Sequence, residues 1–395
     1  MSNISSNSNK YFLSVRQMTV KIAALKERVK GETRVVITPD IAKLYVKKGY
    51  SVFVEKSMGV AANFTDEEYI TAGAKVSGVP LEIISDADVI LKVQPSPIEE
   101  ALNEVNIAKA GATIIGLLSP HSHSEYIDKA ISKNLSTIAM ELVPRITRTQ
   151  GMDVLSSQSN LAGYRAVIEA CYYYDRAVPM MMTAAGTVNP AKTLILGVGV
   201  AGLQAIATAK RLGAAVSAYD VRAITKEQVE SLGAKFVYPA VGIADREDKS
   251  GYAKEVTKDF AAIQEEFLLG IIGNFDIVIT TAQIPGKKAP ILLTKNMVSK
   301  MKPGSVIVDI ATATGGNVED SVMDRIVSKK GVKIIGWSNM AARVATDASK
   351  LYAKNLYNFL EHALKNGKID FSDEIVEEML IGTDGKMMNK KFKIN

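Results

Sequence analysis

Residues 141–167 (ELVPRITRTQGMDVLSSQSNLAGYRAV) are rich in side chains that can hold a ligand and poor in groups that transfer protons. Arg145, Gln150, Asp153 and Ser156 lie within twelve positions, and the span contains no His, Cys or Lys and no Glu after Glu141. Such a set can orient a reacting group by hydrogen bonds and charge, but it offers no general base near neutral pH. The plainer interpretation is a polar loop between domains that ends in helix-capping residues.

A glycine-rich turn marks a second group of functional residues. Gly197, Gly199 and Gly202 follow the apolar run TLIL and open the helical pattern LQAIATAKRLG. In this arrangement the first glycine allows a tight turn, the second lets the backbone approach a pyrophosphate, and the third permits close packing of helix on strand. The helix N-terminus adds N–H donors and a positive dipole. Because the next apolar run ends in Asp220, where a ribose-binding acid is expected, we favour a dinucleotide site over an empty glycine-rich turn.

Asp220 also indicates which dinucleotide binds. A carboxylate accepts hydrogen bonds from both ribose hydroxyls of NAD, whereas it repels a 2′-phosphate. Arg222 lies two residues further on and could hold that phosphate, which weakens the inference. The sequence therefore favours NAD(H) over NADP(H).

The two groups of residues together suggest hydride exchange between nicotinamides. A dehydrogenase acting on an alcohol or amine must also move a proton, whereas exchange between two nicotinamide rings needs positioning alone. Gln150 and Ser156 could clamp the nicotinamide carboxamide. Asp153 could favour the positively charged oxidised ring, or pair with Arg145. The chain has three histidines, and His121 and His123 lack the further ligands that a metal site needs.

The elements that must position these residues follow an alternating strand and helix pattern. Short β-branched apolar runs recur at 20–27, 50–56, 87–93, 112–118 and 136–143, and again through the second half of the chain. Helical patterns are expected at 38–49, 156–175 and 346–367, with Ser157 or Ser159 capping the second of them. Such repetition is typical of parallel sheets buried on both faces. We predict an α/β fold of two Rossmann-like domains with mostly parallel sheets, linked by long helices, with a cleft between them.

The predicted domain organisation is discontinuous. Residues 1–17 are Ser/Asn-rich and are expected to be a disordered extension. Residues 18–160 plus 346–395 form the first α/β domain, and residues 161–345 form the NAD-binding Rossmann domain.

Composition excludes several classes of protein. The 395 residues are 47% apolar and 23% charged with a net charge of +6, which is a globular balance. No basic stripe with interleaved aromatics suggests nucleic-acid binding. No apolar window suggests direct membrane insertion. Cys171, the single cysteine, is expected to pack in a core and excludes an intrachain disulfide.

Several longer segments of the chain resemble a known family. MELVPRITRTQGMDVLSSQSNLAGYRAV, MMMTAAGTVNPAKTLILGVGVAGLQAIATAKRLGA, DVRAITKEQVESLGAKF, KPGSVIVDIATATGGN and RVATDASKLYAKNLYNFL closely resemble the NAD(H)-binding component, domain I, of proton-translocating NAD(P) transhydrogenase. The resemblance implies a homodimer, peripheral on the cytoplasmic face of the inner membrane. It implies that this component passes hydride from NADH to NADP⁺ held by domain III, coupled to proton flow through membrane-embedded domain II, with Re/Si-specific chemistry.

The resemblance also implies site residues. Arg145, Gln150, Asp153 and Ser156 match the loop that positions the nicotinamide, and Tyr252 matches the tyrosine of a mobile loop. Upstream of Tyr252 the sequence YPAVGIADREDKS departs from the family pattern. The full set of expected nucleotide contacts is Arg148, Gly197, Val198, Gly199, Val200, Ala201, Gly202, Asp220, Val221, Arg222, Gly251, Tyr252, Thr281 and Gln283.

Two alternatives remain at the level of the sequence. Alanine dehydrogenase is similar in fold and shares a lysine in the segment LKV, here Lys92. Its catalytic histidine aligns with Ser119, although His121 is only two residues away. The second alternative is an NAD-sensing or scaffold protein without catalysis.

Overall fold

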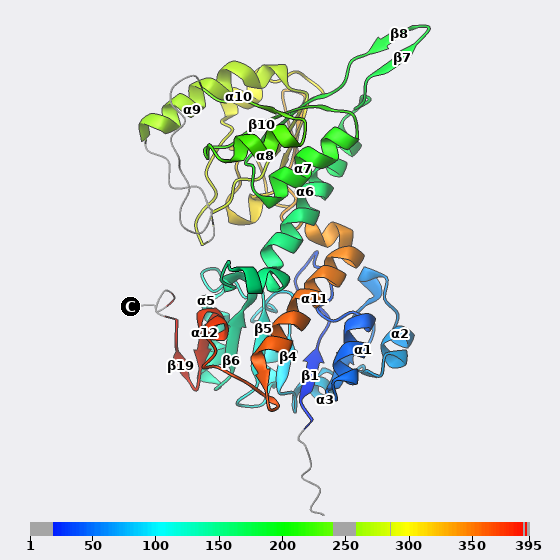
Figure 1. The fold of residues 1–395 in the computed structure, drawn as a ribbon, viewed down its shortest axis with the longest axis vertical. Coiled ribbons are helices and arrows are strands. Elements are labelled where there is room, and N and C mark those ends of the chain that lie inside the picture. Colours follow the sequence, from blue (N-terminus) through cyan, green and yellow to red (C-terminus); the bar gives the residue numbers. More distant parts are fainter. Residues whose placement is uncertain (1–18, 240–257, 285, 390–391, 393–395) are drawn as a thin grey trace, which may run out of the picture.

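Two α/β domains make up the computed structural model, which describes residues 19–239, 258–284, 286–389 and 392 (Figure 1). Each domain is built on one sheet, and two long helices, α6 (Val154–Tyr173) and α11 (Ala345–Ala363), run where the domains meet (Figure 1). The predicted fold class, two Rossmann-like domains with mostly parallel sheets, is confirmed. The disordered extension predicted for residues 1–17 lies outside the described residues, and the predicted domain boundaries stay predictions.

The first sheet has eight strands in the order β19-β18-β6-β5-β4-β1-β2-β3. Strands β1 to β6 are parallel in the doubly wound order 3-2-1-4-5-6. Of the two C-terminal strands, β18 pairs antiparallel with β6 and β19 pairs antiparallel with β18. The strands are β1 (Lys21–Ala24), β2 (Ser51–Glu55), β3 (Lys75–Ser77), β4 (Val89–Leu91), β5 (Thr113–Gly116), β6 (Ser136–Ala139), β18 (Leu380–Thr383) and β19 (Lys386–Met387). The helices are α1 (Pro39–Lys47), α2 (Asp66–Thr71), α3 (Pro80–Ile84), α4 (Glu104–Ile107), α5 (Ser124–Ser132) and α12 (Glu374–Met379).

The second sheet repeats the doubly wound order in β11-β10-β9-β12-β13-β15-β14, with only β14 antiparallel to its neighbour. The strands are β9 (Lys192–Leu196), β10 (Ala215–Tyr219), β11 (Lys235–Phe236), β12 (Ile277–Thr280), β13 (Val306–Asp309), β14 (Ile326–Lys329) and β15 (Val332–Ile335). The helices are α7 (Val200–Arg211), α8 (Thr225–Ser231), α9 (Lys258–Ile271) and α10 (Lys295–Lys300).

Short elements complete the chain. Two small hairpins are β7 (Met181–Thr183) with β8 (Gly186–Val188), and β16 (Leu364–Lys365) with β17 (Lys368–Ile369). The 3₁₀ turns are η1 (Val60–Ala62), η2 (Met140–Leu142), η3 (Thr147–Met152), η4 (Ile272–Asn274), η5 (Thr312–Thr314) and η6 (Ala341–Val344). Among the described residues, none of the helices combines the length and the apolar character that a membrane span needs.

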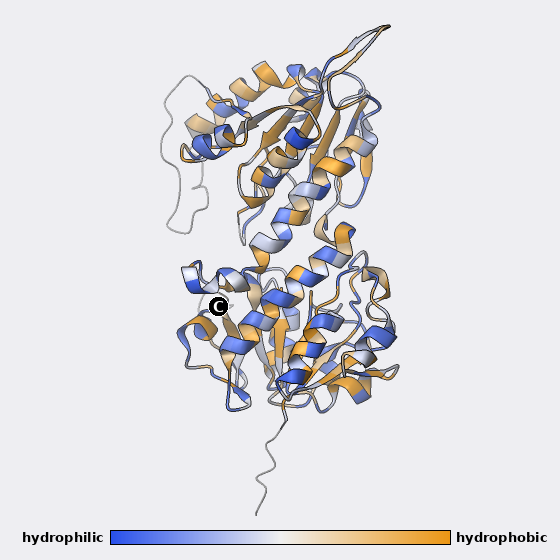
Figure 2. Cartoon of the chain, turned by 45° about the vertical axis from the view of Figure 1, so that its right-hand side comes forward, coloured by the Kyte–Doolittle hydropathy of each residue, from blue (hydrophilic) through white to orange (hydrophobic). Residues whose placement is uncertain are grey.

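The cores explain why the short apolar runs became strands. Every residue of β4, β5, β6, β12 and β13 is buried, as expected for parallel strands covered on both faces. Figure 2 shows the strands as mainly hydrophobic and the helices as mixtures of hydrophilic and hydrophobic residues. Cys171, the residue predicted to be a core side chain, is partly buried and packs against the second domain's core.

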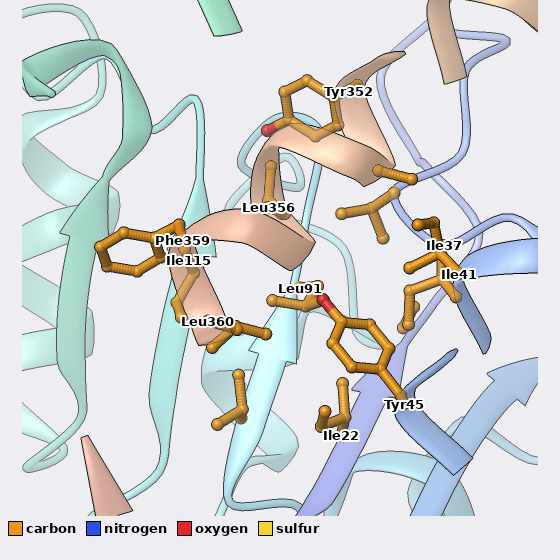
Figure 3. Packing of buried hydrophobic residues seen from close by; sticks show 14 of the residues in the cluster. Ile22, Ile37, Ile41, Tyr45, Leu91, Ile115, Tyr352, Leu356, Phe359 and Leu360 are labelled. Carbon is orange, nitrogen blue, oxygen red and sulfur yellow. The ribbon is translucent and has the colours of Figure 1, made fainter. Parts of the chain in front are cut away.

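Helix α11 closes the first domain's core. Tyr352, Leu356, Phe359 and Leu360 point from α11 toward the sheet, where they meet strand residues such as Leu91 (Figure 3). The Tyr352 hydroxyl also donates a 2.9 Å hydrogen bond to the backbone carbonyl of the residue after β4. A helix from the C-terminal end of the sequence therefore packs over the N-terminal sheet.

The cap predicted for the helix at 156–175 is wrong. The helix begins at Val154, and Asp153 is its N-cap, accepting a 2.9 Å hydrogen bond from the Ser156 backbone N–H. Ser157 instead donates to Asn355 on α11. An aspartate suits this position because its charge also complements the helix dipole.

Candidate functional site

The glycine-rich turn lies where a doubly wound sheet binds ligands. Strands β9 and β12 are neighbours at the centre of the second sheet, and the strand order reverses between them. Ligands of such sheets bind outside the carboxyl ends of the strands at this switch point. Gly197 follows β9 directly and Thr281 follows β12, so both predicted groups of contacts meet there.

The three glycines differ in what surrounds them. Gly197 has a φ of +94°, and a Cβ on it would lie 2.8 Å from the Thr281 Oγ1 atom. A Cβ on Gly202 would lie 2.0 Å from the Gly197 carbonyl oxygen, so helix and turn touch. Gly199, the N-cap of α7, has nothing within 4 Å of its would-be Cβ. This arrangement fits a pyrophosphate, which would approach the backbone at Gly199 near the N-terminus of α7.

Asp220 lies immediately after β10, and its carboxylate is hydrogen-bonded to other residues of the chain. Its carboxylate accepts hydrogen bonds from the Val198 backbone N–H at 2.7 Å and from the Arg222 backbone N–H at 2.9 Å. The Arg222 guanidinium adds two more, each 2.9 Å long. Asp220 is therefore placed beside the turn, as the sequence predicts, and its partner is the arginine two residues away.

The other predicted nucleotide contacts fall into three groups. Val200 is exposed at the start of α7, and Ala201 next to it is buried. Thr281 donates to the Gly197 carbonyl at 2.9 Å, and the exposed Gln283 donates to Ile310. Val221 is half-buried between Asp220 and Arg222, while Gly251 and Tyr252 lie outside the described residues.

Arg148 is paired within the first domain. Its guanidinium forms an ion pair with Glu374 of α12, and both side chains are more than half exposed. An exposed pair of this kind contributes little to stability, about 0 to 1 kcal/mol, so a ligand phosphate could replace the carboxylate at low cost. The predicted role of Arg148 in nucleotide binding stays a prediction.

Arg145, Gln150, Asp153 and Ser156 come together around one pocket. The pocket has a volume of about 550 Å³, and the segment 144–156 alone supplies its lining. Its remaining lining residues are Pro144, Ile146, Thr147 and Thr149. No His, Cys, Lys or Glu is among these eight residues. The four side chains predicted to act together therefore share one concave surface.

Three residues that the sequence did not single out hold this segment in shape. The buried Thr149 hydroxyl lies within hydrogen-bonding distance of the carbonyl oxygens of Pro144 and Ile146. Asn355 and Asn358, one turn apart on α11, both donate to the Gly151 carbonyl, at 2.9 and 2.8 Å. The only signal for the two asparagines was their spacing on a predicted helix.

A fourth such residue supports the other half of the site. Asn317 is fully buried and donates to the carbonyls of Ala282 and Pro290, at 2.9 and 2.7 Å. Its own side-chain oxygen accepts from the Ala282 N–H at 3.0 Å. Asn317 thus fixes the loop that carries Thr281 and Gln283.

Helix α6 connects the pocket with the glycine-rich turn. Asp153 and Ser156 are at its N-terminus, and a Cβ on Gly163 would lie 2.0 Å from the Ala201 carbonyl at the start of α7. Seven to ten residues of helix span about 10 to 15 Å. The pocket is therefore within reach of the nicotinamide half of a dinucleotide whose pyrophosphate lies on the turn.

At the first sheet's own switch point, between β1 and β4, a buried lysine lies beside two carboxylates. Lys92 follows β4 and is fully buried, with its Nζ atom 3.2 Å from Glu27 and 3.9 Å from Glu104. Burial alone would lower the pKa of Lys92, but the two carboxylates raise it above the ordinary lysine value. Lys92 is thus enclosed by Glu27 and Glu104, which would repel an anionic substrate.

The position aligned with the catalytic histidine of the alanine dehydrogenase alternative holds a serine. Ser119, the residue at the aligned position, donates its backbone N–H to the Glu141 carboxylate. His121 packs its ring against Phe392, with ring centroids 4.6 Å apart. A neutral serine hydroxyl is not basic enough to take up a proton at neutral pH, so Ser119 cannot replace a histidine as the general base.

Glu141 gives the fold a pH dependence. Its carboxylate accepts backbone N–H bonds from Leu118 and Ser119, and burial raises its pKa from 4.5 to about 7. The folded chain then keeps the proton while the unfolded chain loses it, so stability should fall as pH rises from about 4.5 to about 7. The protonation of Glu141 in the folded chain contributes at most about 3 kcal/mol to the free energy of unfolding. Denaturant titrations should show it in the wild type and not in Glu141→Gln; identical pH profiles would contradict it.

Comparison with known proteins identifies the family. The sequence model "Alanine dehydrogenase/PNT, N-terminal domain" matches residues 23–162, and "Alanine dehydrogenase/PNT, C-terminal domain" matches residues 166–390. The chain is 62% identical over 370 residues to an NAD(P) transhydrogenase subunit alpha protein of Rickettsia prowazekii, covering 94% of this chain and 96% of that protein. The chain belongs to the NAD(P) transhydrogenase subunit alpha family.

Comparison with solved structures supports the same family assignment. The crystal structure of transhydrogenase from Sinorhizobium meliloti matches with a TM-score of 0.83 at 45% identity, covering 93% of this chain and 99% of that one. Alanine dehydrogenase of Methanococcus maripaludis is a more distant relative, 28% identical over 78% of this chain and 75% of that protein. The resemblance inferred from the sequence is therefore confirmed, and the chain is an NAD(P) transhydrogenase component.

Proposed function

We propose that this chain binds NADH and passes its hydride to NADP⁺ held by a separate partner domain, leaving NAD⁺ here and NADPH on the partner. The observation that carries the proposal is the pocket at residues 144–156. It gathers an amide, a hydroxyl, a carboxylate and a guanidinium, and none of its lining residues is a His, Cys, Lys or Glu. Hydride exchange between nicotinamides needs such positioning and no proton transfer.

Each pocket residue has a role in this proposal. Gln150 and Ser156 would hold the nicotinamide carboxamide, because an amide and a hydroxyl can both donate and accept. Asp153 would stabilise the positive charge that develops on the ring as hydride leaves. Arg145 and Gln150 are exposed, so a second ring could reach the pocket from outside.

The proposed partners follow from the family. We infer that the NADP(H)-binding domain III supplies the second nicotinamide and that the membrane-embedded domain II couples the transfer to proton translocation. The pocket lining contains no His, Cys, Lys or Glu, and its one carboxylate, Asp153, is the N-cap of α6, which supports placing the proton path in the partners. The chain would then be peripheral on the cytoplasmic face of the inner membrane, and the reaction Re/Si-specific.

We further propose a homodimer in which the β7–β8 hairpin of each chain packs against the other chain. The hairpin projects from the second domain (Figure 1), and Met180, Met181 and Met182 expose 44% to 78% of their surfaces. An isolated hairpin is marginally stable in water, so this one needs a covering surface. Replacing the three methionines by serine is expected to shift the chain from dimer to monomer in sedimentation velocity, and an unchanged dimer would rule out this role of the hairpin.

A pair of assays tests the proposed function against its alternatives. The chain mixed with a transhydrogenase domain III, NADPH and an oxidised NAD analogue should reduce the analogue. An amino-acid dehydrogenase would instead oxidise NADH in the presence of pyruvate and ammonia, and an NAD sensor would bind NADH without either reaction. Enclosure of Lys92 by Glu27 and Glu104 predicts no pyruvate-dependent reaction.

A further inference from the structure

The carboxylate expected to hold the adenosine ribose is fully occupied by the protein itself. A carboxylate offers about four lone-pair positions. Asp220 Oδ1 accepts from the backbone N–H and the Nε atom of Arg222, and Oδ2 accepts from the Val198 N–H and the Nη2 atom of Arg222. Both side chains are largely buried, at 7% exposure for Asp220 and 13% for Arg222. A ribose hydroxyl that donates to Asp220 must therefore displace a donor already there.

The guanidinium is the donor that can leave. The backbone N–H groups of Val198 and Arg222 are fixed by the turn and the strand end, whereas the arginine side chain has rotatable bonds. The Arg222 Nη2 atom also donates to the Val198 carbonyl at 3.1 Å, which places the guanidinium over the glycine-rich turn. The guanidinium thus lies at the carboxyl ends of β9 and β10, where the ribose of a bound dinucleotide is expected.

We propose that Arg222 and Asp220 form a specificity pair, in which the arginine competes with the ribose hydroxyls of NAD(H) for the carboxylate. When a substitution removes the negative charge of Asp220, Arg222 binds the 2′-phosphate of NADP(H) instead. The inference rests on the proposed function in taking this turn as the NAD(H) site. It assigns Arg222 a role that a simple ribose contact does not include.

Charge explains why one pair can produce both behaviours. With Asp220 ionised, the guanidinium's charge is cancelled and a 2′-phosphate would meet the carboxylate at close range. Without that negative charge, a planar guanidinium with several N–H donors is suited to bind a phosphate. The carboxylate therefore excludes NADP(H) by repulsion and by keeping Arg222 occupied.

Three variants of the full chain separate these effects: Arg222→Met, Asp220→Asn and the double variant. Methionine keeps much of the arginine's apolar stem, and asparagine can still accept from the Val198 N–H. Binding of NADH, NADPH and the reduced mononucleotide, which lacks the adenosine ribose, is measured by fluorescence titration. The melting temperature of each variant confirms that it is folded, and Arg222→Gln replaces Arg222→Met should that variant be unstable.

Each variant is expected to change the affinities for NADH and NADPH in a different way. Arg222→Met should tighten NADH binding roughly three- to tenfold, because no charge-assisted pair has to be broken, and should leave the mononucleotide unchanged. Asp220→Asn should weaken NADH and tighten NADPH, each about tenfold or more, and the double variant should lose the gain in NADPH binding. Weaker NADH binding by Arg222→Met, or an NADPH gain that persists in the double variant, would overturn the proposal.

These outcomes are separable from failure of the proposed function. A wild-type chain that does not bind NADH would refute the nucleotide site itself. A wild-type chain that binds NADH and transfers hydride with domain III, but whose affinity is unaffected by Arg222→Met, would refute only the specificity pair.

Discussion

Replacing Gly202 by alanine is expected to reduce NADH affinity by roughly a hundredfold or more and to lower stability by about 1 to 3 kcal/mol. The added Cβ would lie 2.0 Å from the Gly197 carbonyl oxygen, a backbone atom, so helix α7 and the turn must separate. That separation removes the close packing and displaces the N–H groups that would face a bound pyrophosphate. Calorimetric titration with NADH and thermal denaturation measure the two effects.

Gly199 provides the matched control. Its φ of −84° suits any residue and its would-be Cβ meets nothing within 4 Å, so Gly199→Ala should change stability by no more than about 0.5 kcal/mol. NADH affinity should still fall, by about tenfold or more, because the methyl group occupies the space through which the pyrophosphate approaches. Equal losses of stability in the two variants, or unchanged NADH binding in Gly199→Ala, would contradict this account of the turn.

Gln150→Asn is expected to slow hydride transfer by roughly a hundredfold while changing NADH affinity only a few-fold. The shorter amide keeps the chemistry of the side chain but moves its hydrogen-bonding atoms away from the pocket. Misplacement of a positioning group affects the transition state more than ground-state binding. Single-turnover transfer with domain III, alongside NADH titration, separates the two quantities, and equal losses in both would argue against a positioning role.

A pair of substitutions at Asp153 distinguishes its two roles. The Asp153→Asn variant would still cap α6, because asparagine is as good an N-cap as aspartate, whereas Asp153→Ala removes the cap at a cost of about 1 kcal/mol. If the carboxylate stabilises the oxidised ring, Asp153→Asn should slow transfer to nearly the same extent as Asp153→Ala without the loss in stability. A normal rate of hydride transfer by Asp153→Asn would show that Asp153 acts only as a helix cap.

Local signals predicted the elements of this fold well. The turn beginning at Gly197 could be assigned because strand, glycines and helix are contiguous. Helix α1 (Pro39–Lys47) forms within the range 38–49 where a helix was expected, and in the structure Thr38 is at its N-cap position. The mostly parallel, doubly wound arrangement follows from repeated βα units, whose crossovers have few stable solutions. These features depend on residues close together in the sequence.

Contacts between distant residues were not predictable. Asn355 and Asn358 support Gly151 from more than 200 positions away, and nothing in their helical spacing identifies that partner. The occupied state of Asp220 was also missed, because a motif shows which residues are adjacent but not which donors fill a carboxylate. Ser157 or Ser159 was expected as the N-cap, and Asp153 was missed, because the sequence alone does not show which of several capping residues starts the helix.

The most direct test of the central claim follows the hydride itself. NADH carrying deuterium at the transferable position is mixed with this chain and domain III loaded with NADP⁺, and the NADPH formed is analysed by mass spectrometry. Direct passage between two rings held face to face predicts that the deuterium appears in NADPH and not in water. Deuterium lost to solvent, or NADPH formed without the label, would contradict the account.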